Sequence, residues 1–281
     1  MKVLRSVIGL SCLIVILFSL GTNFSSCKKE VITDTVFIKD TVHIIDSSTC
    51  SCYNLNDSLV AYYNFNNGTL NDSSGKGNHI ILNNNAVKTA DRFGRANNAY
   101  LFNGIDSYMK VANSSSLNPA NGISIMATIK VNTFNSTNCV TNQVVGKGWN
   151  DFINGFYAMR FYSTVGCQNT VDTSKEVFYG SYGDLNTRSS DYDNNYIHSN
   201  KWYNVVYTSG DGASKIYIDG VLKSTVPSSA TSFTANTQEL YIGKHGDPQY
   251  AYLFSGAIDE IRIYNKVLCA AAVAQLYATK Q

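Results

Sequence analysis

Charged residues are scarce in this chain of 281 residues, since Asp, Glu, Lys and Arg together account for 15% of it, whereas about 25% is usual in soluble domains. The net charge of +2 is too small for a protein that binds nucleic acid by neutralising phosphates. The 3 prolines exclude a Pro-rich or collagen-like chain. The chain has instead 12% aromatic residues within a hydrophobic share of 44%, which excludes a disordered protein.

Glutamate and histidine are also scarce, with four of each. Glycoside hydrolysis usually needs two carboxylates that flank the scissile bond, but Glu30 lies near the N-terminus, and Glu176 and Glu239 are isolated in sequence. Asp259 and Glu260 are neighbours, and on an alternating strand they would point to opposite faces. Neither a zinc-type histidine spacing nor a Gly-x-Ser-x-Gly sequence is present. We therefore expect a non-catalytic protein, with an aspartate pair from different strands as the open alternative.

The N-terminal segment has the pattern of a secretory signal. Lys2 and Arg5 precede an apolar run from Val7 to Leu20, which is shorter than the roughly 20 apolar residues of a membrane-spanning helix. The following Phe24-Ser25-Ser26-Cys27 resembles a bacterial lipobox, which implies cleavage before Cys27 and lipidation of its thiol. The segment 1–26 would then be removed, and the protein would be an outer membrane lipoprotein on the cell surface. A soluble secreted protein that is cut nearby is the alternative.

The segment 27–57 differs in composition from the rest of the chain. Asp34 to Lys39 and Asp40 to Ile45 form a six-residue near-repeat rich in β-branched residues, too short to build a core of its own. We expect an extended stalk that holds a domain away from the membrane. An additional strand packed on the domain, or pairing between neighbouring chains, remains open.

The segment 58–281 reads as a series of short strands broken by Gly, Asn and Ser clusters, followed by one helix. Asp219-Gly220 between apolar runs predicts a two-residue hairpin, and Trp202 is expected to face the core from its alternating strand. The helix is expected over 270–277, with Cys269 as its N-cap. This pattern predicts an all-β protein with one domain, a β-sandwich or barrel. The expected strands lie at 59–65, 99–102, 108–111, 123–131, 156–162, 177–182, 202–208, 216–222, 240–242 and 257–264.

Three stretches together resemble the laminin-G-like domain, a concanavalin A-like lectin/glucanase jelly roll. They are residues 59–79, with Asn71-Asp72-Ser73-Ser74-Gly75-Lys76-Gly77; residues 92–108, with Arg92-Phe93-Gly94-Arg95-Ala96; and Gly256-Ala257-Ile258-Asp259-Glu260-Ile261-Arg262 with the terminal helix. The resemblance covers about residues 58–279. It implies an antiparallel jelly-roll β-sandwich of two sheets whose first and last strands are adjacent.

The same resemblance implies a structural calcium ion, Ca²⁺, which takes six to eight oxygen ligands. Carried over by position, Asp72 and Asp259 would be side-chain ligands, and carbonyl groups near Gly104 and Asp106 would complete the set. The alternative is that Asp72 caps its own turn and that Asp259 accepts a hydrogen bond from a backbone amide.

Of the 7 cysteines, five would remain in an oxidising compartment after the signal is cleaved and Cys27 is lipidated. Cys139 and Cys167 flank neighbouring strands and could form one bond. Cys52 and Cys269 would lie at the same edge if the first and last strands pair, and could form another. Cys50 could replace Cys52, because connectivity cannot be read from sequence, and five reduced thiols are the remaining alternative.

Two Tyr-, Trp- and Asn-rich segments favour sugar recognition, because aromatic faces pack on sugar rings while amides and carboxylates bind their hydroxyls. The site residues expected from these segments are Trp149, Asn150, Asp151, Tyr182, Asp191, Tyr192 and Tyr196. A third, weaker candidate runs from His245 to Tyr250. The expected function is therefore binding of a polysaccharide, glycan or glycoprotein, with the lipid anchor as the only membrane contact. A structural or adhesive module that binds a protein, and a glycoside hydrolase, are the alternatives.

Overall fold

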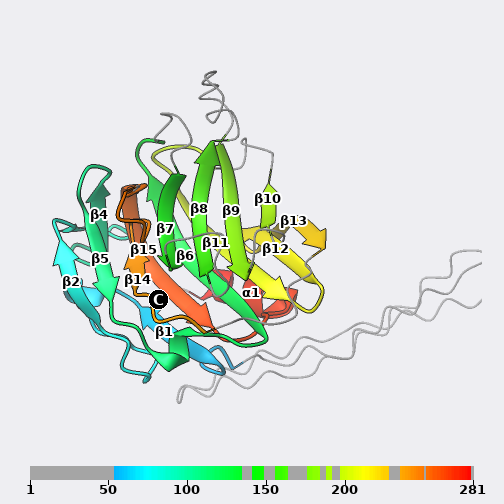
Figure 1. Ribbon diagram of the computed structural model, residues 1–281. Coiled ribbons are helices and arrows are strands. Elements are labelled where there is room, and N and C mark those ends of the chain that lie inside the picture. The colour runs from blue at the N-terminus through cyan, green and yellow to red at the C-terminus, as the bar shows by residue number, and fades with distance from the viewer. Residues whose placement is uncertain are drawn as a thin grey trace, which may run out of the picture. The chain divides into compact units, whose positions relative to one another are not determined.

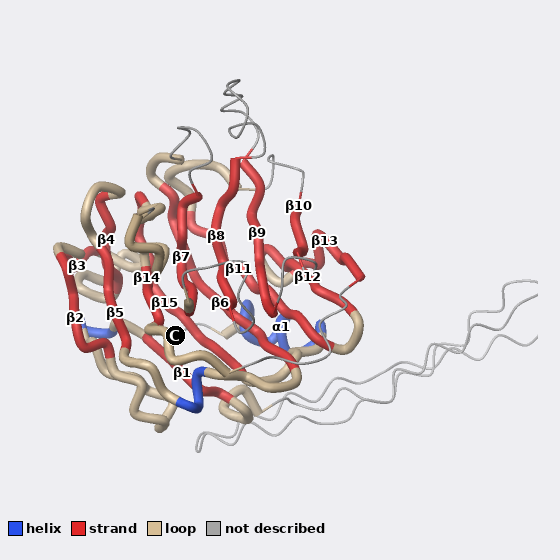
Figure 2. The backbone as a smooth tube through the Cα atoms, in the orientation of Figure 1, coloured by secondary structure: helices blue, strands red, loops and turns tan. Residues whose placement is uncertain are grey.

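A computed structural model describes residues 54–134, 141–148, 156–163, 176–183, 188–191, 197–227, 235–249 and 251–279, with only the backbone for 141, 162–163, 176–183 and 188–191. These residues belong to the compact unit Tyr53–Gln281. Within them the chain forms antiparallel strands in two sheets that stack as two layers (Figures 1 and 2), as the alternation of apolar residues predicts.

The larger sheet has eight strands. Its order is β13 (Val221–Pro227), β12 (Ala213–Ile218), β11 (Trp202–Gly210), β6 (Gly122–Val131), β15 (Ser255–Tyr264), β4 (Ala99–Asn103) and β3 (Val87–Thr89), with β1 (Leu59–Tyr63) also paired to β15. The pairing of β1 with β15 confirms that the first and last strands are adjacent.

The smaller sheet has seven strands. Its order is β10 (Arg188–Asp191), β9 (Glu176–Gly183), β8 (Phe156–Ser163), β7 (Thr141–Lys147), β14 (Leu240–Ile242), β5 (Tyr108–Val111) and β2 (Ile80–Asn84). The edge strands β2, β3 and β10 have no counterpart in the sequence-based prediction, because they are short and partly polar.

The core lies between the two sheets and is built from alternate residues of their strands. Ile125, Ala127 and Ile129 of β6 are fully buried there, and so are Met109 and Val111 of β5 in the facing sheet. This two-sheet arrangement is the antiparallel jelly-roll sandwich expected from the sequence. Two short 3-10 helices, η1 (Asn66–Gly68) and η2 (Ser115–Leu117), lie in the connections.

The single α-helix, α1 (Ala270–Ala278), follows the last strand, and Cys269 is its N-cap residue. Its apolar side buries Val273 and Leu276 in a second cluster with Met126 and Val206, which are on the outer face of the eight-stranded sheet. None of the described helices is long and apolar enough to cross a membrane.

The β12–β13 hairpin forms at the predicted place, with positive φ angles of 51° at Asp219 and 77° at Gly220, as a type I′ turn requires. The expectation for Trp202 is wrong. The alternation of β11 places Tyr203 in the core, so its neighbour Trp202 lies half-buried on the outer face, where the Lys130 ammonium sits 5.2 Å from the centre of its ring.

Candidate functional site

The outer face of the eight-stranded sheet carries a buried polar cluster around an irregularity in β15. The register with β6 shifts between Ile258 and Glu260, which marks a β-bulge. A bulge adds a residue to one strand and re-aims its side chains. Asp259 and Glu260 consequently both contact one guanidinium nitrogen of Arg92, at 3.1 and 3.2 Å. The expectation that these two carboxylates point to opposite faces is therefore wrong.

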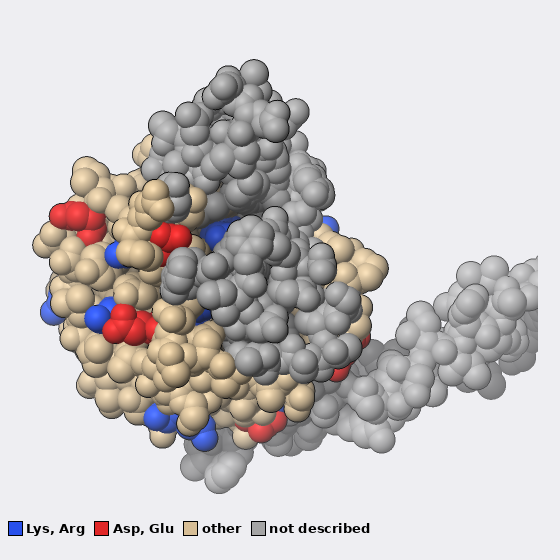
Figure 3. All heavy atoms as spheres, viewed as in Figure 1, with Lys and Arg blue, Asp and Glu red and all other residues tan. Residues whose placement is uncertain are grey.

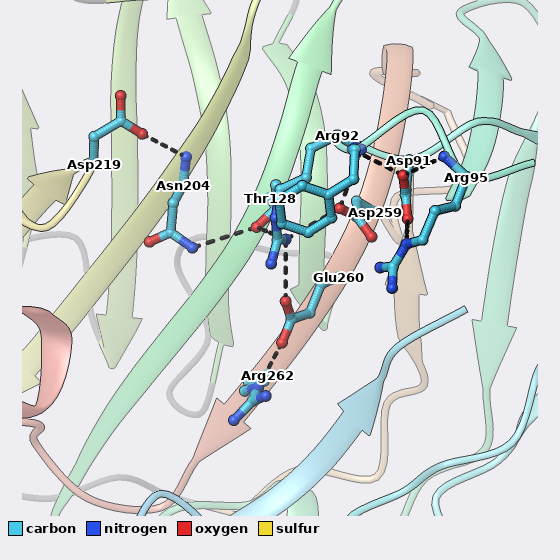
Figure 4. A network of polar contacts seen from close by, with 10 residues as sticks. Asp91, Arg92, Arg95, Thr128, Asn204, Asp219, Asp259, Glu260 and Arg262 are labelled. Carbon is cyan, nitrogen blue, oxygen red and sulfur yellow. Dashed lines mark hydrogen bonds and ion pairs between the residues drawn. The ribbon is translucent and has the colours of Figure 1, made fainter. Parts of the chain in front are cut away.

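Arg92 connects this bulge to the neighbouring strands (Figure 4). Its Nη1 also donates to Oγ1 of Thr128 on β6, at 3.1 Å. The amide of Asn204 on β11 donates to the same hydroxyl at 3.3 Å, and Arg262 donates from the other side to Glu260 at 2.7 Å. The polar chain therefore runs across three adjacent strands of the sheet, and we name it the bulge network.

A tight turn holds Arg92 over the bulge. The buried carboxylate of Asp91 accepts hydrogen bonds from the backbone amides of Phe93 and Arg95, both at 2.8 Å, and pairs with the Arg95 guanidinium. The guanidinium carbons of both arginines lie near the ring of Phe93, Arg92 at 4.8 Å and Arg95 at 5.1 Å from the ring centre. The turn of the motif Arg92-Phe93-Gly94-Arg95 is thus clamped to the centre of the sheet.

Burial shifts the titration of this network. The pKa of Asp259 is raised to about 6 by desolvation, although the positive charge of Arg92 opposes the shift. Desolvation also raises the pKa of Tyr62 to about 12, helped by the negative charge of Glu260. Both carboxylates of the pair are engaged by arginine, so the network holds the turn on the sheet.

Three of the four predicted calcium ligands, Asp72, Asp106 and Asp259, have protein partners, and these lie at separate places. Both oxygens of Asp72 are occupied, because they accept bonds of 2.8 to 2.9 Å from the backbone amides of Tyr62, Ser74 and Asn78 and from the hydroxyl of Ser74. The carboxylate of Asp106 accepts the side-chain amides of Asn103 and Asn85, both at 2.7 Å.

The register of β15 shows how these residues are spread. Asn103, next to Gly104, pairs with Ser255, whereas Tyr62, which contacts Asp72, pairs with Arg262. Seven residues of strand separate Ser255 and Arg262, which is roughly 20 Å at about 3.3 Å per residue. A single ion therefore cannot reach the loops at both ends. Calcium stays a prediction, and any ion here would have to use a smaller set of these oxygens.

Most of the predicted ligand-binding residues lie outside the described residues, namely Trp149, Asn150, Asp151, Tyr192 and Tyr196. The strands that flank them fix their attachment points. Lys147 and Tyr182 both pair with Tyr157, at one end of the seven-stranded sheet. Asp191 pairs with Phe178, which is four residues along β9 from Tyr182. Tyr182 therefore lies at the same end of this sheet as the attachment of the first segment, whereas Asp191 of the second segment lies toward the other end.

Of the cysteines in the predicted disulfide bonds, the structure describes only Cys269. Cys269 is exposed and carries a free thiol, and its expected bond to Cys52 stays a prediction because Cys52 lies outside the described residues. Cys27, Cys50, Cys52, Cys139 and Cys167 lie outside the described residues, and lipidation and the Cys139–Cys167 bond stay predictions.

Sequence reasoning did not identify an aromatic cluster on the outer face of the seven-stranded sheet. Tyr241 lies between the core residues Leu240 and Ile242 of β14, so its ring points away from the core. Tyr108 of β5 is on the same face, and the two ring centres are 6.1 Å apart. The alternation of a three-residue strand was the only sequence signal for this position.

Charged side chains complete the cluster. The Glu239 carboxylate accepts a hydrogen bond from the Tyr241 hydroxyl at 2.7 Å and forms an ion pair with Lys110 at 2.9 Å. Burial and the bond to Glu239 raise the pKa of Tyr241, so its hydroxyl stays protonated. The Lys244 ammonium lies 4.7 Å from the ring centre of Tyr108 and 5.5 Å from that of Tyr241. We name these five residues the tyrosine cluster.

An unpartnered amide lies beside this cluster. Tyr241 pairs with Gly146 of β7, and the side-chain amide of Gln143 occupies the space where a side chain at Gly146 would begin. Gln143 is fully buried, and neither its amide oxygen nor its amide nitrogen has a hydrogen-bond partner in the described part of the chain. Leaving both atoms unbonded costs about 1–3 kcal/mol for each.

The tyrosine cluster combines the groups that a sugar needs, namely half-buried aromatic rings, a cation and a neighbouring amide. Figure 3 shows that the described acidic and basic side chains on this side lie in small mixed groups, with no described patch of a single sign. Among the described residues no group of three or more His, Cys, Asp or Glu side chains is placed to hold a metal ion.

Solved structures with the same fold include binding domains. Domain 4 of AbnA, a GH43 extracellular arabinanase from Geobacillus stearothermophilus solved with arabinotriose, is 21% identical, with a TM-score of 0.56 over 78% of this chain and 98% of that one. The binding domain of botulinum neurotoxin DC, solved with rat synaptotagmin II, is 17% identical, with a TM-score of 0.57 over 79% of this chain.

A structure of botulinum neurotoxin type C, whose cell entry depends on two ganglioside molecules, is 18% identical, with a TM-score of 0.58 over 80% of this chain. The match covers 52% of each of these toxin chains. No curated protein matches the sequence. A family model described as the concanavalin A-like lectin/glucanases superfamily, Laminin_G_3, matches residues 102–274, which is more than half of the chain. Together with the two-layer jelly roll, this match shows that the chain belongs to the laminin-G-like family of the concanavalin A-like superfamily.

Proposed function

We propose that this protein is a non-catalytic, lipid-anchored surface protein whose sandwich domain binds carbohydrate. The tyrosine cluster is the observation that carries the proposal. It presents two half-buried rings, Tyr108 and Tyr241, on the outer face of the seven-stranded sheet, with charged groups around them. Rings of this kind pack against the apolar faces of sugars.

The unpartnered amide of Gln143 lies beside the same site, but it is fully buried, so a ligand reaches it only after the covering side chains shift. A sugar hydroxyl both donates and accepts hydrogen bonds, so it can satisfy an amide oxygen or an amide nitrogen. The amide lies against Gly146 of the same strand, β7, and Gly146 pairs with Tyr241 across the sheet. Two similar folds were solved with sugars or described by their ganglioside dependence, which is consistent with this use of the fold, although folds do not fix functions.

A glycan and polysaccharide array probed with the purified full-length chain tests the proposal, with Ca²⁺ and again with EDTA. Tyr241→Ala should lose binding, because it removes one of the two rings. The matched control is Tyr277→Ala, which removes a tyrosine that is 52% exposed on α1, on the other side of the domain. A folded wild-type chain that binds no sugar, or a Tyr241→Ala variant that binds as wild type does, would remove this site from the proposal.

A protein partner is the second candidate, favoured by exposed apolar side chains along one edge of the sandwich. Ile81 of β2 is 59% exposed, Val87 of β3 is 55% exposed, and Ile105 in the β4–β5 turn is 78% exposed. β2 and β3 are edge strands of the two sheets, and exposed apolar groups at an edge are typical of protein contacts. Crosslinking on the cell surface would test this function if the array gave no sugar.

A further inference from the structure

The charges of the tyrosine cluster are unequally paired. Lys110 and Glu239 form an ion pair, and the second oxygen of Glu239 accepts the Tyr241 hydroxyl. Lys244 has no carboxylate within 4.0 Å and no hydrogen-bond acceptor among the described residues. The cluster therefore has one positive charge in excess, and that charge belongs to Lys244.

The position of this ammonium is fixed by the rings. It lies above both Tyr108 and Tyr241, and cation–π attraction to both rings favours this position. The rings supply no hydrogen-bond acceptor comparable to an anion, so the three N–H donors of the ammonium remain available to an incoming group.

The remaining charges define a direction across the cluster. Glu239 contacts the hydroxyl end of Tyr241, whereas Lys244 lies over its ring. A ligand anion near Glu239 would be repelled, whereas one near Lys244 would be attracted. Cation-to-anion hydrogen bonds are about twice as strong as those between neutral groups, so the site discriminates in favour of an anion at one end.

Taken with the proposed function, on which this step rests, we infer that the tyrosine cluster selects an acidic glycan. A carboxylate or sulfate of the sugar binds the Lys244 ammonium, and an adjacent sugar ring packs on Tyr108 and Tyr241. Glu239 accepts the hydroxyl of Tyr241 and is neutralised by Lys110, so this pair takes no part in charge recognition. The class of ligand is thus an anionic polysaccharide rather than a neutral one.

The test compares charged and neutral forms of the same polymer. The full-length chain is titrated with polygalacturonate and with its methyl ester, which keeps the sugar ring but removes the charge, and with dextran sulfate and dextran. Wild type should bind an anionic form at least about tenfold more tightly than its neutral counterpart, and this preference should weaken as salt rises. Preference for the carboxylated or the sulfated polymer distinguishes the two anions.

Three variants make the test specific for Lys244. Lys244→Gln should lose the preference for the charged polymer, whereas Lys244→Arg, which keeps the positive charge, should retain most of it. The control Lys76→Gln removes an exposed lysine in a distant turn and should bind as wild type does. Thermal unfolding verifies that each variant is folded. Equal binding of charged polymer by wild type and Lys244→Gln would overturn the inference.

The outcomes also separate this inference from the proposed function. Binding of neutral polymers alone, lost in Tyr241→Ala, would overturn the selection of acidic glycans while the proposed carbohydrate site stands. Absence of binding to every polymer by a folded chain would overturn both.

Discussion

The buried carboxylate of Asp259 should make the domain less stable at neutral pH than at mildly acidic pH. Its side chain is 7% exposed and shares Arg92 with Glu260, and burial raises its pKa to about 6. In Asp259→Asn the amide oxygen can still accept the bonds from Arg92, and Glu260 still balances the charge of the guanidinium. The substitution therefore removes the ionisation while it keeps the shape.

The magnitude follows from the two pKa values. The pKa of Asp259 is about 6 in the folded protein and 3.8 in the unfolded chain. Each pKa unit corresponds to about 1.36 kcal/mol, so ionisation of Asp259 lowers the free energy of unfolding by about 3 kcal/mol. Because the folded pKa is raised, this cost is absent below pH 3.8, grows between pH 4 and 6, and is complete above pH 6. Relative to Asp259→Asn, the wild type should therefore lose stability over this window as the pH rises.

Urea unfolding of wild type and Asp259→Asn at pH 4, 5, 6 and 7 measures this difference. The expected result is a variant that is more stable than wild type at pH 7, with the advantage lost near pH 4. The matched control is Asp106→Asn, because bonds from Asn103 and Asn85 lower the pKa of Asp106. Its pH dependence therefore lies below about pH 4, and its stability difference from wild type should stay nearly constant from pH 4 to pH 7. An Asp259→Asn difference that does not vary with pH would refute the reasoning.

Two further predictions concern other buried groups, and a third concerns calcium. Asp72→Ala should destabilise the domain by at least about 3 kcal/mol in urea, because it leaves the amides of Tyr62, Ser74 and Asn78 without their acceptor; an unchanged midpoint would contradict this. Burial lowers the pKa of Lys147 to about 8. The free energy of unfolding of wild type, relative to that of Lys147→Met, should therefore rise by up to about 3 kcal/mol between pH 8 and pH 10.5. A difference between the two proteins that does not change with pH would disprove this. If calcium stabilises the sandwich, EDTA should lower the melting temperature and added Ca²⁺ should restore it. Equal melting temperatures in EDTA and in Ca²⁺ would contradict the predicted calcium site.

The fold could be predicted from the sequence because its determinants are local. Alternation in residues 123–131 fixes a strand with a buried face, and Asp219-Gly220 fixes a turn, since both residues adopt positive φ angles that suit this pair. The helix after Cys269 follows from its apolar spacing. Each of these signals lies within a few neighbouring residues.

The functional groups could not be predicted in the same way, because they depend on register. One extra residue in β15 brings Asp259 and Glu260 to the same arginine, and a one-residue difference in alternation moves Trp202 to the outer face. The tyrosine cluster joins Tyr108 with Tyr241, which are far apart in sequence and meet only because β5 pairs with β14. Neither a bulge nor a strand pairing of this range leaves a local pattern.

The most direct test of the account is amide hydrogen exchange of the full-length chain with and without a saturating glycan from the array. The account predicts added protection in residues 108–111 and 239–244, which contain the tyrosine cluster, and none at the bulge network of Arg92 and Asp259. Protection confined to the eight-stranded sheet, or binding without any change in β5 and β14, would contradict it.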